Sequence, residues 1–338
     1  MASNPSSLLA VSMGDPCGIG PEIIAKAVAT RSLGPVLVVG SVAVMRRAVA
    51  QCGLLLPVAV LEAPADAGQA PPGCLPVWQP PGLPEALAQL PMGAIHADAG
   101  QAAARCIEAG AALVQAGTAS ALVTAPIHKE ALAAAGVPYP GHTEMLQALA
   151  GGAPVRMMLA NEQLRVVLVT IHVALRRAIE LLDEAGILQT LRIAHAAAAA
   201  WGQARPRIAV AGLNPHAGEG GLFGDEELRI IAPAIAAARA EGIDASGPYA
   251  PDTVFMRARH APPAHPGEFD LVVAMTHDHG LIPVKYLGVE EGVNVTLGLP
   301  FVRTSPDHGT AFDIAGSGRA DAASLIAAAR MARALSGA

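Results

Sequence analysis

The sequence predicts an α/β protein, an α/β/α sandwich with two lobes, and two observations carry this prediction. Short runs of apolar and β-branched residues alternate with helical stretches along the whole chain, which is typical of a sheet covered by helices on both faces. The chain has 338 residues, which is long for one compact core and comfortable for two. We therefore expect a second lobe in the middle of the chain.

The first elements follow a strand, loop, helix, strand order. Residues 8–12 read as a strand, residues 13–21 as a glycine-rich loop and residues 22–30 as a helix. A second strand, residues 35–40, follows at the distance of a βαβ unit, which argues for parallel pairing. Residues 63–84 are rich in Pro, Gly and Ala, so we expect irregular surface structure there.

The remaining elements continue the alternation. An alanine-rich helix over residues 99–116 leads into a strand at 121–124, and residues 292–298 read as a further strand. From residue 125 onward, strand-like runs end in polar clusters. Helices are expected at residues 175–182, 186–201, 225–241, 253–259 and 321–335.

Composition restricts the class of protein. Hydrophobic residues make up 52% of the chain and charged residues 15%, which indicates a folded protein. No apolar stretch approaches the ~20 residues that span a bilayer, residues 1–7 lack a basic segment, and the net charge of −6 argues against a nucleic-acid surface. The four cysteines are dispersed and read as reduced thiols, although Cys17 in the glycine loop invites a nucleophile hypothesis. A cytoplasmic small-molecule enzyme with neither a membrane nor a nucleic-acid partner is expected.

Three histidines share one local pattern, a β-rich run followed by an imidazole where the strand should end. They are His172, His216 and His277. The carboxyl ends of strands in an open α/β sheet meet at one edge, so the three side chains would form one constellation. Neutral imidazoles are good ligands for a divalent transition metal. The alternative is that each is an isolated polar residue in a surface loop.

The glycine loop matches neither common nucleotide motif. The glycines at positions 14, 18 and 20 do not fit the Rossmann spacing, and a Walker A sequence is absent. The loop either lets backbone pass close to a ligand or forms a tight turn with Pro21 starting the first helix.

Two groups of residues are candidates for binding an anion. His142 and Thr143 precede an apolar helical stretch, where exposed amides and the helix dipole favour an anion; simple capping by Thr143 is the alternative. Lys285, Asn294 and Arg303 would hold a phosphate or carboxylate if they converge. Otherwise they are scattered surface residues.

The segment 307–316 is a polar loop of small residues. It contains His308 and Asp313, and its composition suits a backbone that wraps a cofactor, with Asp313 accepting from ribose hydroxyls. The alternative is an ordinary polar loop before the last helix.

Five motifs together carry a family resemblance. They are Gly14-Asp-Pro-Cys-Gly-Ile-Gly-Pro-Glu22, Ala125-Pro-Ile-His-Lys-Glu130, Gly141-His-Thr-Glu144, Gly212-Leu-Asn-Pro-His-Ala-Gly-Glu-Gly-Gly221 and the segment 292–316. With them the chain resembles the PdxA family of 4-hydroxythreonine-4-phosphate dehydrogenases of vitamin B6 synthesis, over almost its whole length. More distantly, the first loop and residues 308–316 are similar to isocitrate and isopropylmalate dehydrogenases, which bind NAD(P) without a Rossmann fold.

The resemblance implies an architecture. It is a two-domain α/β/α sandwich of the isocitrate and isopropylmalate dehydrogenase type, with the active site in the interdomain cleft. Residues 1–130 plus 304–338 would form the cofactor side, and residues 131–303 the metal and dimerisation side.

The resemblance also implies a site. The metal ligands would be His172, His216 and His277, contributed from both chains of a homodimer, with Zn, Mg, Mn or Co as the metal. Substrate contacts would come from His142, Thr143, Lys285, Asn294 and Arg303. Cofactor contacts are placed on Asn294, Gly309, Thr310 and Asp313.

The implied reaction is NAD(P)-dependent oxidation and decarboxylation of 4-phosphohydroxy-L-threonine. Lys285 and Asp252 are candidates for proton transfer, although Asp252 could equally cap a helix. His279 stands where the family normally has Gln. Departures of this kind keep open a paralogous 4-phospho-D-threonate or 4-phospho-D-erythronate 3-dehydrogenase, and a more distant branch oxidises a cyclic dihydrodiol. A metal hydrolase and a metal or phosphate-ligand binding protein are the rivals from other classes.

Overall fold

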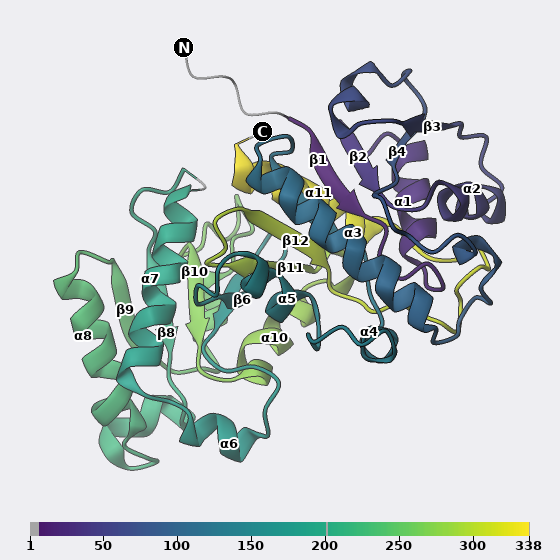
Figure 1. The fold of residues 1–338 in the computed structure, drawn as a ribbon. Coiled ribbons are helices and arrows are strands. Elements are labelled where there is room, and N and C mark those ends of the chain that lie inside the picture. The colour runs from purple at the N-terminus through teal and green to yellow at the C-terminus, as the bar shows by residue number, and fades with distance from the viewer. Residues whose placement is uncertain (1–6, 201, 338) are drawn as a thin grey trace. The chain divides into compact units, whose positions relative to one another are not determined.

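The computed structural model describes residues 7–200 and 202–337, and it divides into two compact units (Figure 1). Unit 1 comprises Met1–Pro154 and Leu299–Ala338, and unit 2 comprises Val155–Gly298. The chain therefore leaves unit 1 and returns to it. The observed division falls at residues 154 and 298, where 130 and 303 were expected.

Within the described residues of unit 1, the strands run in the order β3-β4-β2-β1-β5-β12, and each neighbouring pair is parallel. All residues of β1, β2 and β5 are buried, and a strand buried on both faces requires cover on both sides of the sheet. Unit 1 is thus the parallel α/β structure that the alternating pattern predicts. The bounds are β1 Leu9–Ser12, β2 Val36–Val39, β3 Val58–Leu61, β4 Leu75–Trp78, β5 Ala121–Thr124 and β12 Val302–Pro306.

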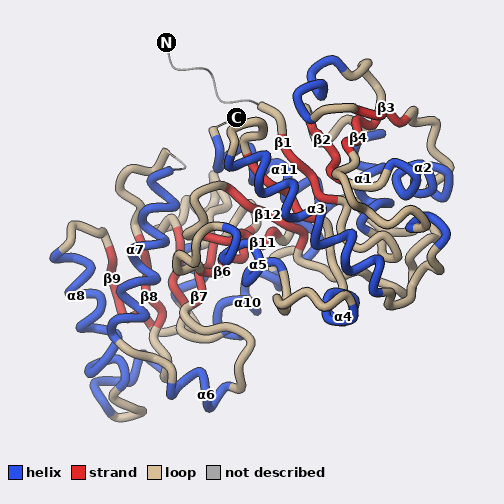
Figure 2. The backbone as a smooth tube through the Cα atoms, viewed as in Figure 1, coloured by secondary structure: helices blue, strands red, loops and turns tan. Residues whose placement is uncertain are grey.

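Helices of unit 1 pack on this sheet (Figure 2), with α3 and α11 both in contact with β1 and β5. Helix α1 begins at Gly20 with Pro21 in its first turn, where the missing N–H of proline costs nothing. The helix expected over residues 22–30 thus begins two residues earlier, with Pro21 in its first turn as the tight-turn alternative has it. The helical bounds are α1 Gly20–Ala29, α2 Val42–Gln51, η1 Pro64–Gln69, η2 Leu87–Gln89, α3 Ala97–Gln115, α4 Lys129–Ala134, α5 His142–Leu149 and α11 Ala323–Ser336.

The expectation of irregular structure over residues 63–84 was wrong. This segment contains η1 and the strand β4, which pairs with β2 on one side and β3 on the other. Leu75 and Val77 are fully buried, so burial between two strands outweighs the local Pro and Gly content. Both partner strands lie outside residues 63–84, and the composition of that segment does not indicate the pairing.

Unit 2 has strands in the order β11-β6-β7-β10-β8-β9. The pairs β11/β6 and β6/β7 are antiparallel, whereas β7, β10, β8 and β9 are mutually parallel. A core of buried aliphatic residues from β7, β8 and β10 meets Val254 and Phe255 of α9. The strand bounds are β6 Arg156–Ala160, β7 Arg165–Leu168, β8 Ile208–Ala211, β9 Ala245–Tyr249, β10 Leu271–Ala274 and β11 Val293–Leu297.

The helical segments of unit 2 agree with most of the expected ones. They are α6 Leu175–Glu180, α7 Glu184–Ala200, η3 Pro215–Gly221, η4 Glu227–Ile231, α8 Ala232–Ala240, α9 Val254–Ala258, α10 His277–Tyr286 and η5 Val289–Glu291. Trp201, the expected end of α7, lies outside the described residues. The segment η4 is π-helical and runs directly into α8.

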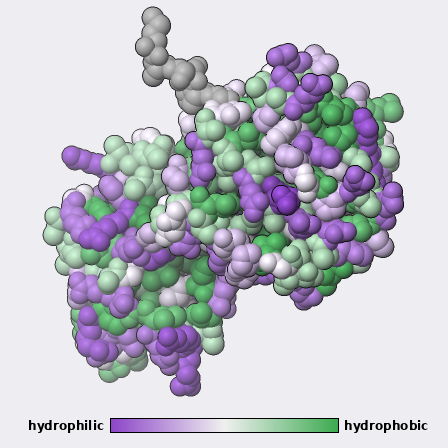
Figure 3. All heavy atoms as spheres, viewed as in Figure 1, coloured by the Kyte–Doolittle hydropathy of each residue, from purple (hydrophilic) through white to green (hydrophobic). Residues whose placement is uncertain are grey.

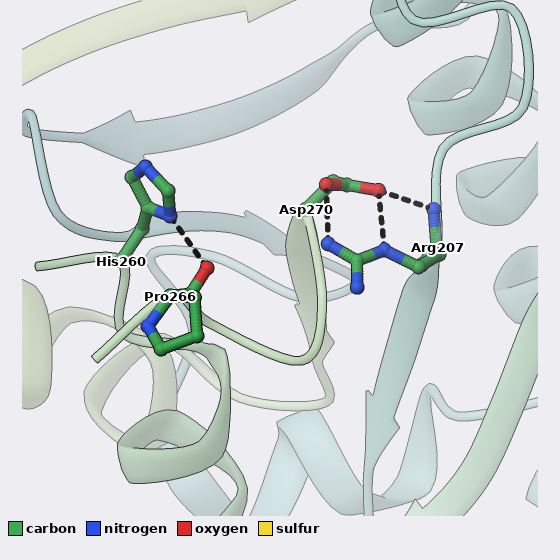
Figure 4. Close-up of polar contacts among 4 residues, drawn as sticks. All are labelled: Arg207, His260, Pro266 and Asp270. Atoms are coloured by element: carbon green, nitrogen blue, oxygen red, sulfur yellow. Dashed lines mark hydrogen bonds and ion pairs between the residues drawn. The ribbon is translucent and has the colours of Figure 1, made fainter. Parts of the chain in front are cut away.

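The amino ends of β8 and β10 are joined by an ion pair. Arg207 donates to the Asp270 carboxylate from its backbone N–H (2.7 Å), Nε (3.2 Å) and Nη2 (3.0 Å) (Figure 4). Burial alone would raise the pKa of Asp270, but these bonds lower it. The polar groups at this edge therefore bind one another, and the candidate chemistry lies at the opposite ends of the strands.

No helix among the described residues is long and apolar enough to cross a membrane. Hydrophobic side chains nevertheless reach the surface of both units among hydrophilic ones (Figure 3).

Candidate active site

The three histidines predicted as metal ligands follow adjacent parallel strands. The sheet places β10 between β7 and β8, and all three run in the same direction. His172 follows β7, His277 is the first residue of α10 after β10, and His216 lies in η3 after β8. The expected delivery of three imidazoles beyond the carboxyl ends of neighbouring strands is what this topology produces.

Two of these histidines lie against each other. The ring centroids of His172 and His277 are 5.5 Å apart, with an angle of 48° between the rings. The ring of His216 instead meets Phe223 edge-on, at 6.0 Å. Within residues 7–200 and 202–337, no group of three or more His, Cys, Asp or Glu side chains is arranged to hold a metal. One chain therefore brings together two of the three predicted ligands.

Carboxylates orient two of the imidazoles. Nδ1 of His216 lies 3.0 Å from Oε2 of Glu219, and Nδ1 of His277 lies 2.8 Å from Oδ1 of Asp278. A carboxylate that accepts from Nδ1–H fixes the tautomer and leaves Nε2 with its lone pair, which is the common arrangement of a metal-ligating histidine.

The backbone at His172 and His216 is strained. Their φ angles are 46° and 55°, in the left-handed region that residues with a side chain rarely adopt. Such conformations persist only where the surrounding structure enforces them, and they cluster at functional sites.

A groove of about 870 Å³ in unit 2 contains His216 and two other residues of interest, Asp252 and His279. Helix α9 has Thr253 as its N-cap, so the alternative that Asp252 caps this helix is wrong. Nδ1 of His279 is buried and has no hydrogen-bond partner in the described part of the chain. The other lining residues are Leu164, Leu213, Pro215, Pro251, Phe255, Met256, Arg259, Asp278, Ile282, Pro283, Tyr286 and Leu287.

The start of α5 and a buried arginine form a second candidate site, in unit 1. His142 and Thr143 are the first two residues of α5, and the N-cap is Gly141. Because the N-cap is Gly141 and Thr143 lies inside the helix, the alternative of capping by Thr143 is wrong. The first-turn amides and the helix dipole thus favour an anion at this end.

Arg303 lies close enough to His142 for the two to interact electrostatically. Arg303 is on β12 with 3% of its surface exposed, and it donates to Oγ1 of Thr124 from Nε (3.2 Å) and Nη2 (2.6 Å). Burial lowers its pKa to about 9, so it remains charged at neutral pH. Burial, and then the charge of Arg303, lower the pKa of His142. The structure therefore brings these two predicted phosphate ligands together.

The other two predicted substrate residues belong to unit 2. Lys285 is exposed on the last turn of α10, and Asn294 is half-buried on β11, opposite Leu159 of β6.

The two loops proposed to approach a cofactor pack on each other in unit 1. The backbone N–H of Ile19 donates to the carbonyl of Thr310 (3.0 Å), and a Cβ at Gly18 would lie 2.9 Å from Cβ of Thr310. Glycine is needed at position 18 because this approach leaves no room for a side chain. Gly309 borders open space and Asp313 is exposed, so both are accessible to a ligand.

Three residues that sequence reasoning missed position parts of the candidate sites. Thr124 binds Arg303, as described above. Glu22, fully buried in α1, accepts from the backbone N–H groups of Gly316 and Gly318 (3.0 Å for the second). Glu227 of η4 accepts from backbone N–H groups just before His216. Each contact joins segments that are distant in sequence or separated by an irregular loop, and no local pattern indicates them.

Comparison with known proteins decides the family. The family model described as "Pyridoxal phosphate biosynthetic protein PdxA" matches residues 32–332. The chain belongs to the PdxA family. The family resemblance inferred from the five motifs is thereby confirmed.

Proteins with two different names are among its relatives. A 4-hydroxythreonine-4-phosphate dehydrogenase of Beijerinckia indica is 57% identical, covering 94% of this chain and 91% of the relative. A D-threonate 4-phosphate dehydrogenase of Pectobacterium atrosepticum is 45% identical, with coverages of 97% and 98%.

Solved structures agree with this fold. A 4-hydroxythreonine-4-phosphate dehydrogenase from Klebsiella pneumoniae superposes with a TM-score of 0.89 at 45% identity, covering 99% of both chains. A terephthalate 1,2-cis-dihydrodiol dehydrogenase from Burkholderia xenovorans has a TM-score of 0.66 at 31% identity and covers 98% of both chains. The mixed α/β fold expected from the sequence is confirmed.

Proposed function

We propose that this PdxA family member is a 4-hydroxythreonine-4-phosphate dehydrogenase. It oxidises and decarboxylates 4-phosphohydroxy-L-threonine to 3-amino-2-oxopropyl phosphate with NAD or NADP as hydride acceptor, in pyridoxal phosphate biosynthesis. The observation that carries the proposal is the 57% identity to a relative of that name, against 45% to a D-threonate 4-phosphate dehydrogenase.

The reaction makes four demands on the protein. The hydride of the secondary alcohol goes to the nicotinamide, the hydroxyl proton must reach a base, and the new ketone must accept the electron pair released as CO2 departs. The phosphate of the substrate must also be held, because tight positioning supplies much of the rate. Each demand has candidate residues in this chain.

Phosphate binding is assigned to His142, Thr143 and Arg303, which all lie in unit 1. Lys285 and Asn294 are proposed as further substrate-binding residues. Arg303 and the first turn of α5 supply positive potential, and Thr124 fixes the plane of the guanidinium. A dihydrodiol substrate has no phosphate to use such a group. The chemistry of these residues therefore favours a phosphorylated substrate.

His172, His216 and His277 fit a divalent metal, for which Zn, Mg, Mn and Co remain candidates. Their fit rests on the adjacent rings of His172 and His277 and on the two carboxylates that contact Nδ1 of His216 and His277. A metal there would supply Lewis acidity that lowers the hydroxyl pKa and stabilises negative charge on the substrate oxygen. Lys285 and Asp252 are the proposed proton-transfer residues, and Asp252 shares a groove with His216.

Gly309, Thr310 and Asp313 of unit 1 are the proposed cofactor contacts, and Asn294 is a further candidate. The packing of the 14–21 loop on Thr310 supports this assignment, since a loop held close to another backbone can present its amides to a ligand. The exposed Asp313 carboxylate can accept from ribose hydroxyls.

A homodimer that shares its active sites is the proposed assembly. No complete set of metal ligands occurs in the described part of one chain, and a second chain can supply the missing one. The groove beside His216 also exposes large apolar side chains, including Ile282 (65% exposed) and Tyr286 (90% exposed). Exposed apolar surface of this kind is typical of an interface.

A substrate comparison tests the proposal. Formation of reduced nicotinamide is measured with 4-phosphohydroxy-L-threonine, 4-phospho-D-threonate and 4-phospho-D-erythronate, after chelation and again after metal is restored. We expect the highest kcat/KM with 4-phosphohydroxy-L-threonine, and only in the presence of metal. A higher value with 4-phospho-D-threonate or 4-phospho-D-erythronate assigns the chain to the paralogous sugar-acid dehydrogenases.

A further inference from the structure

The loop that carries His216 has an unusual backbone. Five consecutive residues, His216 to Gly220, have positive φ angles between 44° and 82°. Three of them, His216, Ala217 and Glu219, have side chains. A left-handed turn of L-residues is disfavoured because Cβ crowds the following carbonyl, so this loop needs an external restraint.

The carboxylate of Glu227 is hydrogen-bonded to the residues that lead into this loop. Oε1 accepts from the backbone N–H groups of Leu213 and Asn214, both at 2.7 Å, and Oε2 accepts from Nδ2 of Asn214 at 2.9 Å. The residue is only 2% exposed. Burial alone would raise its pKa, but the bonds from Asn214 and Leu213 lower it, so the group is ionised at neutral pH.

Two glycines show how tightly the loop closes on this carboxylate. A Cβ at Gly212 would lie 3.0 Å from Oε1, and one at Gly218 would lie 2.8 Å from Oε2. Gly212 directly follows β8, and Gly218 is the central residue of the left-handed turn. The carboxylate thus contacts the loop on both sides of His216.

We infer that Glu227 is the positioning residue of His216. Its carboxylate restrains the left-handed turn and so fixes the position of the imidazole in the groove. The exposed Glu219 contacts the imidazole itself, at 3.0 Å. Glu227 itself touches neither substrate nor cofactor in this assignment. The inference deepens the proposed function and rests on it, because His216 is a metal ligand only in that proposal.

The amide replacement Glu227→Gln removes the charge and almost none of the volume. One oxygen can still accept from Leu213 and Asn214, but the new NH2 group then faces the NH2 of Asn214, and two donors cannot bond. Asp225→Asn is the matched control. Asp225 is two residues away and exposed, and its side chain pairs with Arg229.

The test is calorimetric titration of metal-free protein with Co²⁺ and with Zn²⁺, well below the unfolding temperature. We expect Glu227→Gln to weaken metal binding about 10- to 100-fold, the range for partners that orient a metal ligand. Asp225→Asn should bind like the parent. Ile187→Val, which removes a methylene from the buried face of α7, controls for general loss of stability and should also bind like the parent.

The outcomes distinguish a failure of the role inferred for Glu227 from a failure of the proposed metal site. Parent-like affinity in Glu227→Gln overturns the inference, and so does an equal loss in Ile187→Val. Absent binding in the parent, or parent-like binding in His216→Ala, overturns the metal site instead. If Glu227→Gln does not fold, Asn214→Ala removes the side-chain bonds to Oε2 of Glu227 and to Oε2 of Glu226, and it keeps the two backbone donors to Oε1 of Glu227. Parent-like metal binding in that variant also overturns the inference.

Discussion

The side chains of this site depend on specific partners. His216 and His277 each have a carboxylate at Nδ1, and Arg303 has the hydroxyl of Thr124. Some of these partners are close to their ligand residue along the chain, and others are not. Asp278 and Glu219 are close neighbours along the chain, whereas Thr124 is 179 positions from Arg303.

Replacing His172 or His277 by Ala should abolish turnover and greatly weaken metal binding without unfolding the protein, because each change removes one proposed ligand from an otherwise intact strand end. Activity, metal content and circular dichroism measure the three effects. Full metal content in His277→Ala would falsify the ligand assignment.

Replacing Arg303 by Ala should mainly raise KM for the phosphorylated substrate. A charge-assisted hydrogen bond contributes about 1.5–3 kcal/mol, which corresponds to a loss of roughly ten- to a hundredfold in kcat/KM. Thr124→Val should have a smaller effect in the same direction, because it removes only the acceptor that orients the guanidinium. If Arg303→Ala keeps the parent's preference for phosphorylated over dephosphorylated substrate, Arg303 does not bind the phosphate.

Cys17 should be chemically inert. It is fully buried, and burial together with Asp15 raises its pKa to about 11. A raised thiol pKa keeps the nucleophilic thiolate scarce at all pH values well below 11, so alkylation at pH 8 should be slow while the folded state persists. The partly exposed Cys74 serves as the internal control. Mass spectrometry that finds Cys17 modified before Cys74 contradicts this prediction and revives the nucleophile hypothesis.

Among the elements, helix α1 holds the segment that follows Asp313 through two side chains. Glu22 accepts from Gly316 and Gly318, and Nζ of Lys26 donates to the carbonyls of Gly318 and Ala320, both at 2.6 Å. Both side chains come from α1, so one helix holds the segment that follows Asp313.

Glu22→Gln should therefore raise KM for the nicotinamide cofactor more than KM for the phosphorylated substrate. The amide can accept from only one of the two N–H groups, which loosens the loop proposed to contact the cofactor. Steady-state kinetics with each ligand varied in turn give the two values. Equal rises in both, or a rise only for the substrate, argue against a role of this loop in cofactor binding.

Sequence reasoning placed most elements correctly where the pattern was local. The histidine positions after β7, β8 and β10 follow from short buried strands, and Pro21 marked the start of α1. It failed for β4, where pairing with β2 and β3 decides the structure. It could not reveal the left-handed turn at His216, because the carboxylate beneath it belongs to a separate helical segment.

At the scale of the whole molecule, the proposed dimer should depend on the groove beside His216. Ile282→Asp combined with Tyr286→Asp places charges on exposed apolar positions, and desolvating them would oppose association. We expect sedimentation velocity to show a monomer for the double variant and a dimer for the parent, with activity lost together with the dimer. A double variant that stays dimeric moves the interface elsewhere.

In the proposed function, this chain couples oxidation to decarboxylation at a metal site. The most direct measurement is the stoichiometry of reduced nicotinamide and CO2 formed from 4-phosphohydroxy-L-threonine by the metal-loaded protein. We predict equal amounts of the two products, and neither from the chelated protein until metal is restored. Turnover without nicotinamide, as a metal hydrolase would show, or reduced nicotinamide without CO2 would contradict the claim.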